Sequence, residues 1–329
     1  MLSHPGHTTP TPGEAVLRWN TRAHSIAGIE AELARIWSSV SLESAGDGGE
    51  PERRVAPRSS VMNLVVIAGR SEIGERIAAI VEGLTGRPPS RTLVVSQADP
   101  DGPAWLDAQV QAHCMLPRDG AAETCAELVY LTAGGQAGQH LAGVVSPLLI
   151  HDLPVTIWWP GEPNLDLPGT ADLLDLADRV LVDGSSWSGD GLARLVAMSR
   201  LPRRFSVEVS DFAMLRQSRW REAIASTFDR PAMLSFLGGI REISVTYAAR
   251  EGSAGRANVI KPLYHVAWLA SRLRMTCIEP LVGEQAPWAG YHAALKHGKR
   301  RIEVGLRPVQ SDSPPGTTLS VRLVAERRR

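Results

Sequence analysis

Residues 62–97 have the sequence MNLVVIAGRSEIGERIAAIVEGLTGRPPSRTLVVSQ. The runs at 62–69 and 90–97 are short and apolar with several β-branched residues, which is typical of buried strands. Between them, residues 73–86 carry apolar positions at helical spacing and end on Gly86, a residue that commonly terminates helices. This order predicts a β-α-β unit with two parallel strands, and therefore an α/β fold.

An antiparallel hairpin is expected after this unit. Small or apolar residues alternate with polar ones up to Cys114, the pair Asp119-Gly120 is a turn signal, and a second apolar run occupies 123–131. If Asp119 and Gly120 form the turn, Cys114 lies directly opposite Cys125. The same count predicts a hydrogen-bonded pair with Cα atoms about 5.5 Å apart, within disulfide range. Two hypotheses follow: a readily reduced regulatory disulfide, or two small buried thiols kept reduced.

The chain is predicted to form two small α/β domains with mixed sheets, preceded by an N-terminal helix. The expected segments are a flexible tail (1–13), the helix and a linker (14–57), a first domain (58–163) and a second domain (164–329). The helix is expected because apolar residues recur at spacings of three and four from Ile26 through Ile29, Leu33, Ile36, Trp37 and Val40.

The β/α alternation resumes in the second domain. Helices are expected at 170–177, 191–199 and 259–273, and a helical region is expected at 211–228. Strands are expected at 179–183, 204–209, 242–248, 301–309 and 318–326.

Composition and charge exclude several classes of protein. Of 329 residues 43% are hydrophobic and 21% charged, and 35 Lys+Arg balance 35 Asp+Glu, so neither disorder nor nucleic-acid binding is indicated. No run approaches the roughly 18 apolar residues of a membrane span, and the first residues lack the pattern of a secretion signal. We therefore expect a cytoplasmic protein without membrane contact. The three cysteines form no CxxC, so no structural zinc site is predicted.

Motifs for catalysis are missing from the sequence. It has no P-loop, GxSxG, HExxH or EF-hand pattern, which favours a non-catalytic protein without a cofactor. The best ligand candidate is the loop at 183–191, DGSSWSGDG, where Ser185, Ser186 and Ser188 follow a strand and precede a helix. Two interpretations of this loop remain: a turn with helix caps, or the phosphate site of a sugar-phosphate or nucleotide-binding enzyme.

Tryptophan usage is unusual, with nine Trp against four Phe and four Tyr. Trp158 and Trp159 are adjacent in a predicted strand, VTIWWPGEP, so their indoles point to opposite faces. One can fill the domain core, whereas the other needs a second cover. That cover is either a helix of the same fold or a partner protein, because Trp is enriched at interface hot spots.

Several segments, in order, resemble the glucose-6-phosphate dehydrogenase assembly protein family, OpcA. They are MNLVVIAG, SRTLVV, SPLLIHDLPVTIWWPGEP, VDGSSW, DFAMLRQSRWREAIASTFD and AWLASRL. The resemblance covers roughly residues 25–280, and its most specific elements are LPVxxWWPG and DxxxLRxxxWRE.

This resemblance implies a protein that is not itself an enzyme. Members of the family bind glucose-6-phosphate dehydrogenase, the NADP-dependent entry step of the oxidative pentose phosphate pathway, promote its active oligomer and raise its activity allosterically. The expected partner interface comprises Trp158, Trp159, Pro160, Gly161, Arg219, Trp220 and Arg221. Trp220 is expected to anchor a helix in the core, with Arg219 and Arg221 outside it as a charged rim or simply as a solvated face. In photosynthetic relatives the activity is linked to cysteines, which makes Cys114 and Cys125 a candidate redox pair.

Overall fold

The computed structural model describes residues 15–42, 60–69, 71–84, 90–115, 124–167, 169–250, 257–283 and 290–327. The expected tail at 1–13, most of the expected linker and the turn at Asp119-Gly120 lie outside these residues. The chain forms two compact units, the first comprising residues 1–181 and 202–208 and the second residues 182–201 and 209–329. Residues 164–181, which the sequence placed in the second domain, therefore lie in the first unit. None of the described helices combines the length and hydropathy that a membrane span requires.

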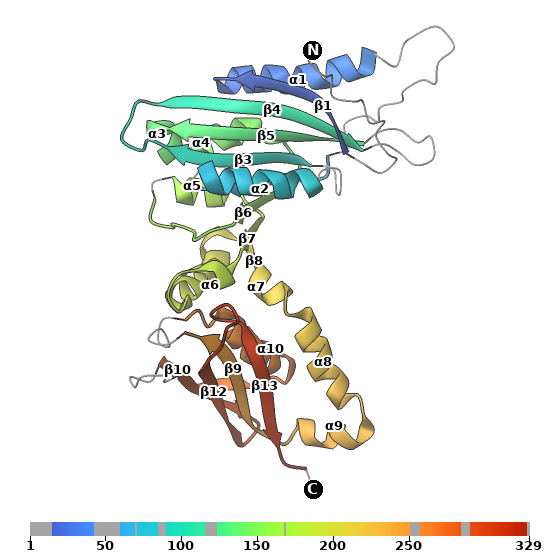
Figure 1. Ribbon diagram of the computed structural model, residues 1–329, viewed down its shortest axis with the longest axis vertical. Coiled ribbons are helices and arrows are strands. Elements are labelled where there is room, and N and C mark those ends of the chain that lie inside the picture. Colours follow the sequence, from blue (N-terminus) through green and yellow to red (C-terminus); the bar gives the residue numbers. More distant parts are fainter. Residues whose placement is uncertain are drawn as a thin grey trace, which may run out of the picture. The chain divides into compact units, whose positions relative to one another are not determined.

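The larger sheet has eight strands in the order β1-β4-β5-β3-β2-β6-β7-β8 (Figure 1). The strands are β1 (Ala15–Ala23), β2 (Asn63–Ile67), β3 (Arg91–Ala98), β4 (Trp105–Met115), β5 (Thr124–Gly134), β6 (Val155–Trp159), β7 (Arg179–Val182) and β8 (Glu208–Asp211). Strand β2 pairs in parallel with β3 and with β6, and β3 pairs in parallel with β5. Strand β4 is antiparallel to both β1 and β5. The predicted β-α-β unit and hairpin are thus joined in one mixed sheet.

Helices cover both faces of this sheet. They are α1 (Ile26–Leu42), α2 (Ser71–Leu84), α3 (Gly135–Gln139), α4 (Leu141–Val145), the short 3-10 helix η2 (Ser146–Leu148) and α5 (Thr170–Asp175). Helix α2 packs on one face, where Ile77 and Val81 meet Val66, Val94 and Leu128 from three parallel strands. Successive side chains of a strand point to opposite faces of the sheet. The residues directly before and after Val66, Val94 and Leu128 therefore face away from α2.

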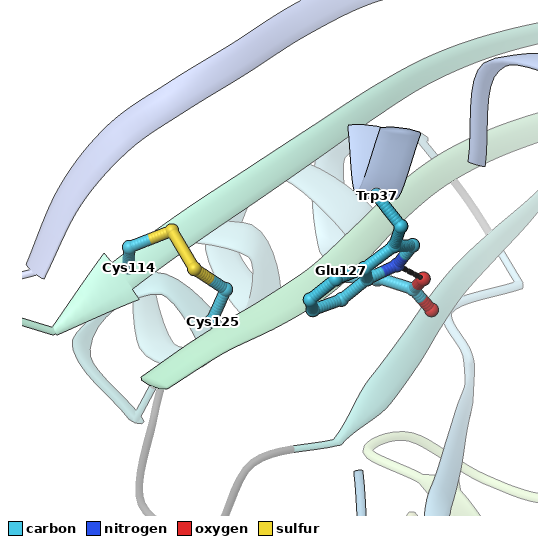
Figure 2. Close-up of a disulfide and its surroundings, with 4 residues drawn as sticks. All are labelled: Trp37, Cys114, Cys125 and Glu127. Carbon is cyan, nitrogen blue, oxygen red and sulfur yellow. Dashed lines mark hydrogen bonds between the residues drawn. A yellow bond between two sulfur atoms is a disulfide. The ribbon is translucent and has the colours of Figure 1, made fainter. Parts of the chain in front are cut away.

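Helix α1 docks on the face opposite α2. Ile29, Leu33 and Ile36 are at most 3% exposed, which confirms the predicted apolar stripe. The indole Nε1 of Trp37 donates a hydrogen bond to the Glu127 carboxylate on β5 (Figure 2). This contact settles where the N-terminal helix packs.

The Glu127 carboxylate is the most deeply buried charge of this layer, with a fully inaccessible side chain. Arg91 Nε on β3 donates to its Oε2 at 2.5 Å, and Arg91 Nη1 donates to the backbone oxygen of Leu148 at 2.7 Å. A buried carboxylate without such partners would be strongly destabilising. The network therefore joins β3, β5, α1 and η2 through one ion pair.

The smaller sheet has five strands in the order β10-β11-β12-β9-β13. The strands are β9 (Ile240–Ala249), β10 (Thr276–Gly283), β11 (Tyr291–His297), β12 (Arg300–Gln310) and β13 (Thr318–Ala325). Strands β9 and β12 are parallel, and the other three pairings are antiparallel. Helix α10 (Ile260–Arg272) covers one face, where Val266 and Leu269 pack with Val245, Tyr247 and Val304. Two mixed sheets with helices confirm the predicted α/β class.

The remaining elements are η3 (Gly184–Ser186), α6 (Leu192–Phe205), α7 (Phe212–Leu215), α8 (Ser218–Phe228) and α9 (Pro231–Leu237). The helical region expected at 211–228 is present as two helices with a break at Gln217, whose Nε2 donates to Ala213 O at 2.8 Å. The strand expected at 204–209 begins only at Glu208, because α6 continues to Phe205 and ends where Ser206 takes a positive φ of 54°.

Three strands were not predicted from the sequence. Strand β1 is an edge strand with a register shift between Leu17 and Trp19, which interrupts the alternation of its side chains between the two faces of the sheet. Strand β10 is also an edge strand, almost wholly exposed and containing Pro280. Strand β11, YHAALKH, has small residues in place of β-branched ones. The expected strands at 179–183 and near 208 do form, but they extend the larger sheet instead of starting a second one.

We predict that Glu127→Gln lowers the free energy of unfolding by about 3–5 kcal/mol, because it leaves the Arg91 guanidinium buried without its counter-charge. Glu208→Gln is the matched control, since the Arg179–Glu208 pair has side chains 50% and 61% exposed. Its loss should be about 0–1 kcal/mol. Urea denaturation measures both, and equal small losses would show that the Glu127 network contributes little to stability.

Candidate functional site

A cavity of about 570 Å³ lies in the first unit, at the carboxyl ends of β2, β3 and β6. Ile67 ends β2, Gln97 lies near the end of β3, and Trp159 ends β6. Helices add Ile73 from α2 and Leu173 from α5. In α/β sheets such a crevice is the usual place for a ligand.

The two adjacent tryptophans occupy opposite faces of β6, as the sequence predicts. Trp158 packs with the cluster beneath α2, and Trp159 is 6% exposed and forms part of the cavity wall. Gly161 also lines the cavity, and Pro160 between them is half-buried. The sequence left open whether the indole outside the core is covered by a helix of the same fold or by a partner protein. Because Trp158 packs beneath α2 and Trp159 is buried, the structure favours a helix of the same fold.

The predicted charged helix segment lies on α8. Trp220 is half-buried and meets the His265 ring edge-on, with ring centroids 5.5 Å apart. Arg219 is exposed, whereas Arg221 is half-buried and its Nη1 donates to the backbone oxygen of Met214 at 2.5 Å. Only Arg219 of this pair is therefore free to serve as the expected rim, because Arg221 holds the connection between α7 and α8.

An apolar groove of about 410 Å³ runs between α8, α9 and β13 in the second unit. Phe228, Met233 and Phe236 line its helical side, and Leu323 lines its strand side. Neither α8 nor α9 contains a buried residue, and Leu234 on α9 is 59% exposed. Exposed apolar surface beside a groove is typical of a protein-binding site. The segment PAMLSFL at 231–237 was the sequence signal for this surface, and it was not recognised from the sequence.

His265 on α10 is buried without polar support. It is 1% exposed, and neither of its ring nitrogens has a hydrogen-bond partner among the described residues. Burial, followed by the positive charge of Arg221, lowers the pKa of His265 to about 4. The ring is therefore neutral at physiological pH and acts as an apolar partner for Trp220.

The loop at 183–191 uses its polar groups internally. Ser185 Oγ donates to Asp183 Oδ1 at 2.6 Å, and Ser186 Oγ donates to Asp183 O at 2.7 Å. Asp190 Oδ1 accepts from Leu192 N at 3.0 Å, which caps α6. These contacts support the interpretation as a turn with helix caps.

The carboxylates of Asp183 and Asp211 lie at this loop. Asp211 Oδ1 accepts from Gly184 N at 3.0 Å, and its Oδ2 accepts from the Tyr264 hydroxyl at 2.7 Å. Burial raises the pKa of Asp211, and the charge of Asp183 raises it further. Arg216 Nη1 forms an ion pair with Asp183 Oδ2 at 2.5 Å, so a phosphate here would compete with that carboxylate for the guanidinium, which disfavours the phosphate-site interpretation. Within the described part of the chain, no group of three His, Cys, Asp or Glu is placed to hold a metal ion.

The hairpin register is confirmed, because Cys114 pairs with Cys125 between β4 and β5. The two residues form a disulfide and are 1% and 2% exposed (Figure 2). The expected wide, hydrogen-bonded pair is wrong, since the Cα atoms are 4.0 Å apart, as at a narrow, non-hydrogen-bonded site. Cys125 and Glu127 are two residues apart on β5 and so share the face that α1 covers.

The cavity itself was not predicted from the sequence. Its wall combines residues from distant parts of the chain, such as Gly69, Gln97 and Gln139. The available signal was the predicted β-α-β unit, because ligands of such units bind beyond the carboxyl ends of the strands.

Two family models match the chain, and both describe a glucose-6-phosphate dehydrogenase subunit. The model of the N-terminal domain of this subunit matches residues 81–200, and the model of its C-terminal domain matches residues 207–328. Together they cover well over half of the chain.

Two curated relatives that match the chain are named OpcA. A protein of Synechocystis sp. named "Putative OxPP cycle protein OpcA" is 28% identical over 188 residues, which is 56% of this chain and 37% of that protein. A protein of the same name from Nostoc punctiforme is 25% identical over 169 residues, which is 51% of this chain and 34% of that protein. The matched part of the chain thus spans about a third of the length of these relatives.

Solved structures share only a distant likeness. An oxidoreductase from Sinorhizobium meliloti is 11% identical with a TM-score of 0.45, covering 81% of this chain and 70% of that one. So distant a likeness says nothing about activity.

We predict that the stability of the protein falls as the pH drops from about 6.5 towards 4. The unfolded chain takes up a proton on His265 near pH 6.5, whereas the folded chain does so only near pH 4. The contribution of neutral His265 to the free energy of unfolding is thus complete above pH 6.5, and acidification towards pH 4 lowers that free energy by roughly 3 kcal/mol. Urea denaturation across this range should show a shallower loss for His265→Leu. Parallel curves for the two proteins would contradict the assignment.

We also predict that the natively folded, mildly oxidised protein has a single thiol that reacts with a titrating reagent. That thiol is Cys277, which is exposed, while the disulfide holds the other two cysteines. Reduction followed by denaturation should raise the count to all three. Denaturation without a reductant should leave the count at one, and three reactive thiols at that step would instead support the hypothesis of two buried free thiols.

Proposed function

Because the chain belongs to the glucose-6-phosphate dehydrogenase assembly protein family, OpcA, we propose that it is a non-catalytic, cytoplasmic partner of glucose-6-phosphate dehydrogenase. In this proposal the chain binds the dehydrogenase, promotes its active oligomer and raises its activity allosterically. NADPH production in the oxidative pentose phosphate pathway is then the process that it supports. The observation that carries the proposal is the match of consecutive family models across 81–200 and 207–328.

The surface formed by α8 and α9 is the interface that we assign to the dehydrogenase. Its apolar groove and the exposed Leu234 supply the area whose burial drives association. Arg219 on α8 adds an exposed charge outside the groove, which would steer the encounter more than tighten the complex. Trp158, Trp159, Pro160 and Gly161 were also expected at the interface, but Trp159 is buried and the other three are half-buried, so the more exposed α8–α9 surface is the one that we propose.

The direct test uses glucose-6-phosphate dehydrogenase encoded by the same genome. We expect the rate of NADPH formation from glucose 6-phosphate and NADP⁺ to rise when the purified chain is added. The chain without the dehydrogenase should form no NADPH. An unchanged rate at saturating concentrations of the chain would count against activation, and turnover by the chain itself would revive the enzyme alternative.

We predict that Leu234→Asp weakens the activation by about tenfold or more, because it places a charge in the apolar contact. Val196→Asp is the matched control, since Val196 lies on α6 of the same unit and is 50% exposed, close to the 59% of Leu234. Both variants should keep the melting temperature of the parent protein, because both sites are exposed. If the two variants lower activation equally, the surface formed by α8 and α9 is not the interface.

A further inference from the structure

We infer that the dehydrogenase adds an extended segment, as a further strand, to the free edge of β13 in the second unit. Apolar side chains at every second position of that segment then lie in the groove beside α8 and α9. The inference rests on the proposed function and deepens it, because it states the conformation and the sequence pattern of the partner segment. The edge of β13, the direction of its backbone groups and the placement of its side chains carry it.

Strand β13 is the last strand of the smaller sheet, with β9 on one side only. An edge strand presents backbone groups to which an incoming strand can bond, and proteins often block such edges. The opposite edge of this sheet is blocked, because β10 contains Pro280 and its pairing with β11 has two register shifts. Strand β13 carries no proline, and its pairing with β9 is regular from Ser320 to Val324. Its edge is therefore a regular template for a further strand.

The backbone groups of β9 alternate between its two neighbours. Ala248 N–H donates to Thr317 O and Ala248 O accepts from Gly316 N, each at 2.8 Å, so Ala248 points to the segment that leads into β13. Ala249 O accepts from Ser311 N at 3.4 Å, on the side of β12. The pairing of β9 with β12 has no register shift. The even-numbered residues of β9 therefore hydrogen-bond towards β13, and the odd-numbered residues towards β12.

The backbone groups of Val321 and Leu323 on β13 point away from β9. These two residues lie opposite Val245 and Ile243, which are odd-numbered residues of β9. At such non-hydrogen-bonded pairs of an antiparallel ladder, the N–H and C=O groups of both residues face outwards. The N–H and C=O groups of Val321 and Leu323 therefore face the free edge of the sheet, where they are available to a further strand.

The side chains of the same two residues line the groove. Val321, Leu323 and Ala325 are spaced two positions apart on β13, so they share the face of the sheet that borders it. Helices α8 and α9 form the opposite wall, with Phe228 and Met233 among its residues (Figure 1). A strand added beside β13 places every second side chain on this face, between β13 and the helices. The segment that fits therefore alternates apolar with polar residues.

The size of the groove favours strand addition over docking by side chains alone. Stable interfaces bury about 800 Å² on each partner, whereas a groove of about 410 Å³ has room for only a few side chains. Backbone hydrogen bonds along β13 extend the contact beyond the groove. A helix laid in the groove would instead cover the edge of β13 without bonding to it, and unpaired backbone groups that lose water cost free energy.

The backbone contact is tested with Val321→Pro, because proline removes the N–H that faces the free edge while the hydrogen bonds to β9 stay. We expect its affinity for the dehydrogenase, measured by isothermal titration calorimetry, to fall about tenfold or more. Val321→Ala is the matched control, since it keeps the N–H but has a smaller apolar side chain than proline. Melting temperatures show whether both variants are folded. If Val321→Ala binds as weakly as folded Val321→Pro, or more weakly, side chains alone carry the contact and the inference is overturned.

Hydrogen–deuterium exchange of the unmodified chain, resolved to single residues, tests the same contact without a variant. We expect the amides of Val321 and Leu323 to exchange about tenfold or more slowly in the complex with the dehydrogenase. The amide of Arg322 should change little, because it already bonds to β9.

The exchange experiment separates failure of the inference from failure of the proposed function. A complex that forms without protection of Val321 and Leu323 overturns the inference and leaves the proposed function standing. Protection of both amides in the chain alone, rising with its concentration, identifies a second copy of the chain as the added strand and also overturns the inference. If no complex forms, the proposed function fails and the inference falls with it.

Discussion

The burial of the Glu127 carboxylate is the constraint on which the first unit depends. A charge with no exposed surface needs both a counter-ion and hydrogen bonds, and Arg91 and Trp37 supply them. Because Arg91 also binds the oxygen of Leu148, the same network fixes α1 and η2 on one face of the sheet. Helix α2 is left to cover the other face. The crevice between these layers at the ends of the parallel strands is where the cavity lies.

Local sequence patterns were sufficient for some parts of the fold. The β-α-β unit at 62–97, the buried stripe of Ile29, Leu33 and Ile36, and the pairing of Cys114 with Cys125 all follow from periodicity over a few residues. The docking of α1 could not be predicted in this way. The Trp37–Glu127 bond spans 90 positions of the chain and the Arg91–Glu127 pair spans 36, so no local pattern reports them.

At the candidate sites, too, some features follow from local sequence and others depend on contacts between distant residues. The opposite orientation of Trp158 and Trp159 follows from strand geometry, but what covers each indole depends on α2 and on residues around the cavity. Trp220 was expected to anchor its helix in the core, but it is half-buried and packs edge-on against the ring of His265, which lies on a separate helix. The cavity belongs to the first unit and the apolar groove to the second, so variants of one unit test each of them separately.

We propose that this chain binds glucose-6-phosphate dehydrogenase as a non-catalytic partner. Sedimentation velocity of the purified dehydrogenase, with and without the chain, measures that association without reference to turnover. We predict a new species that contains both proteins and is larger than either one alone. Two boundaries that sediment independently at all mixing ratios would contradict the account.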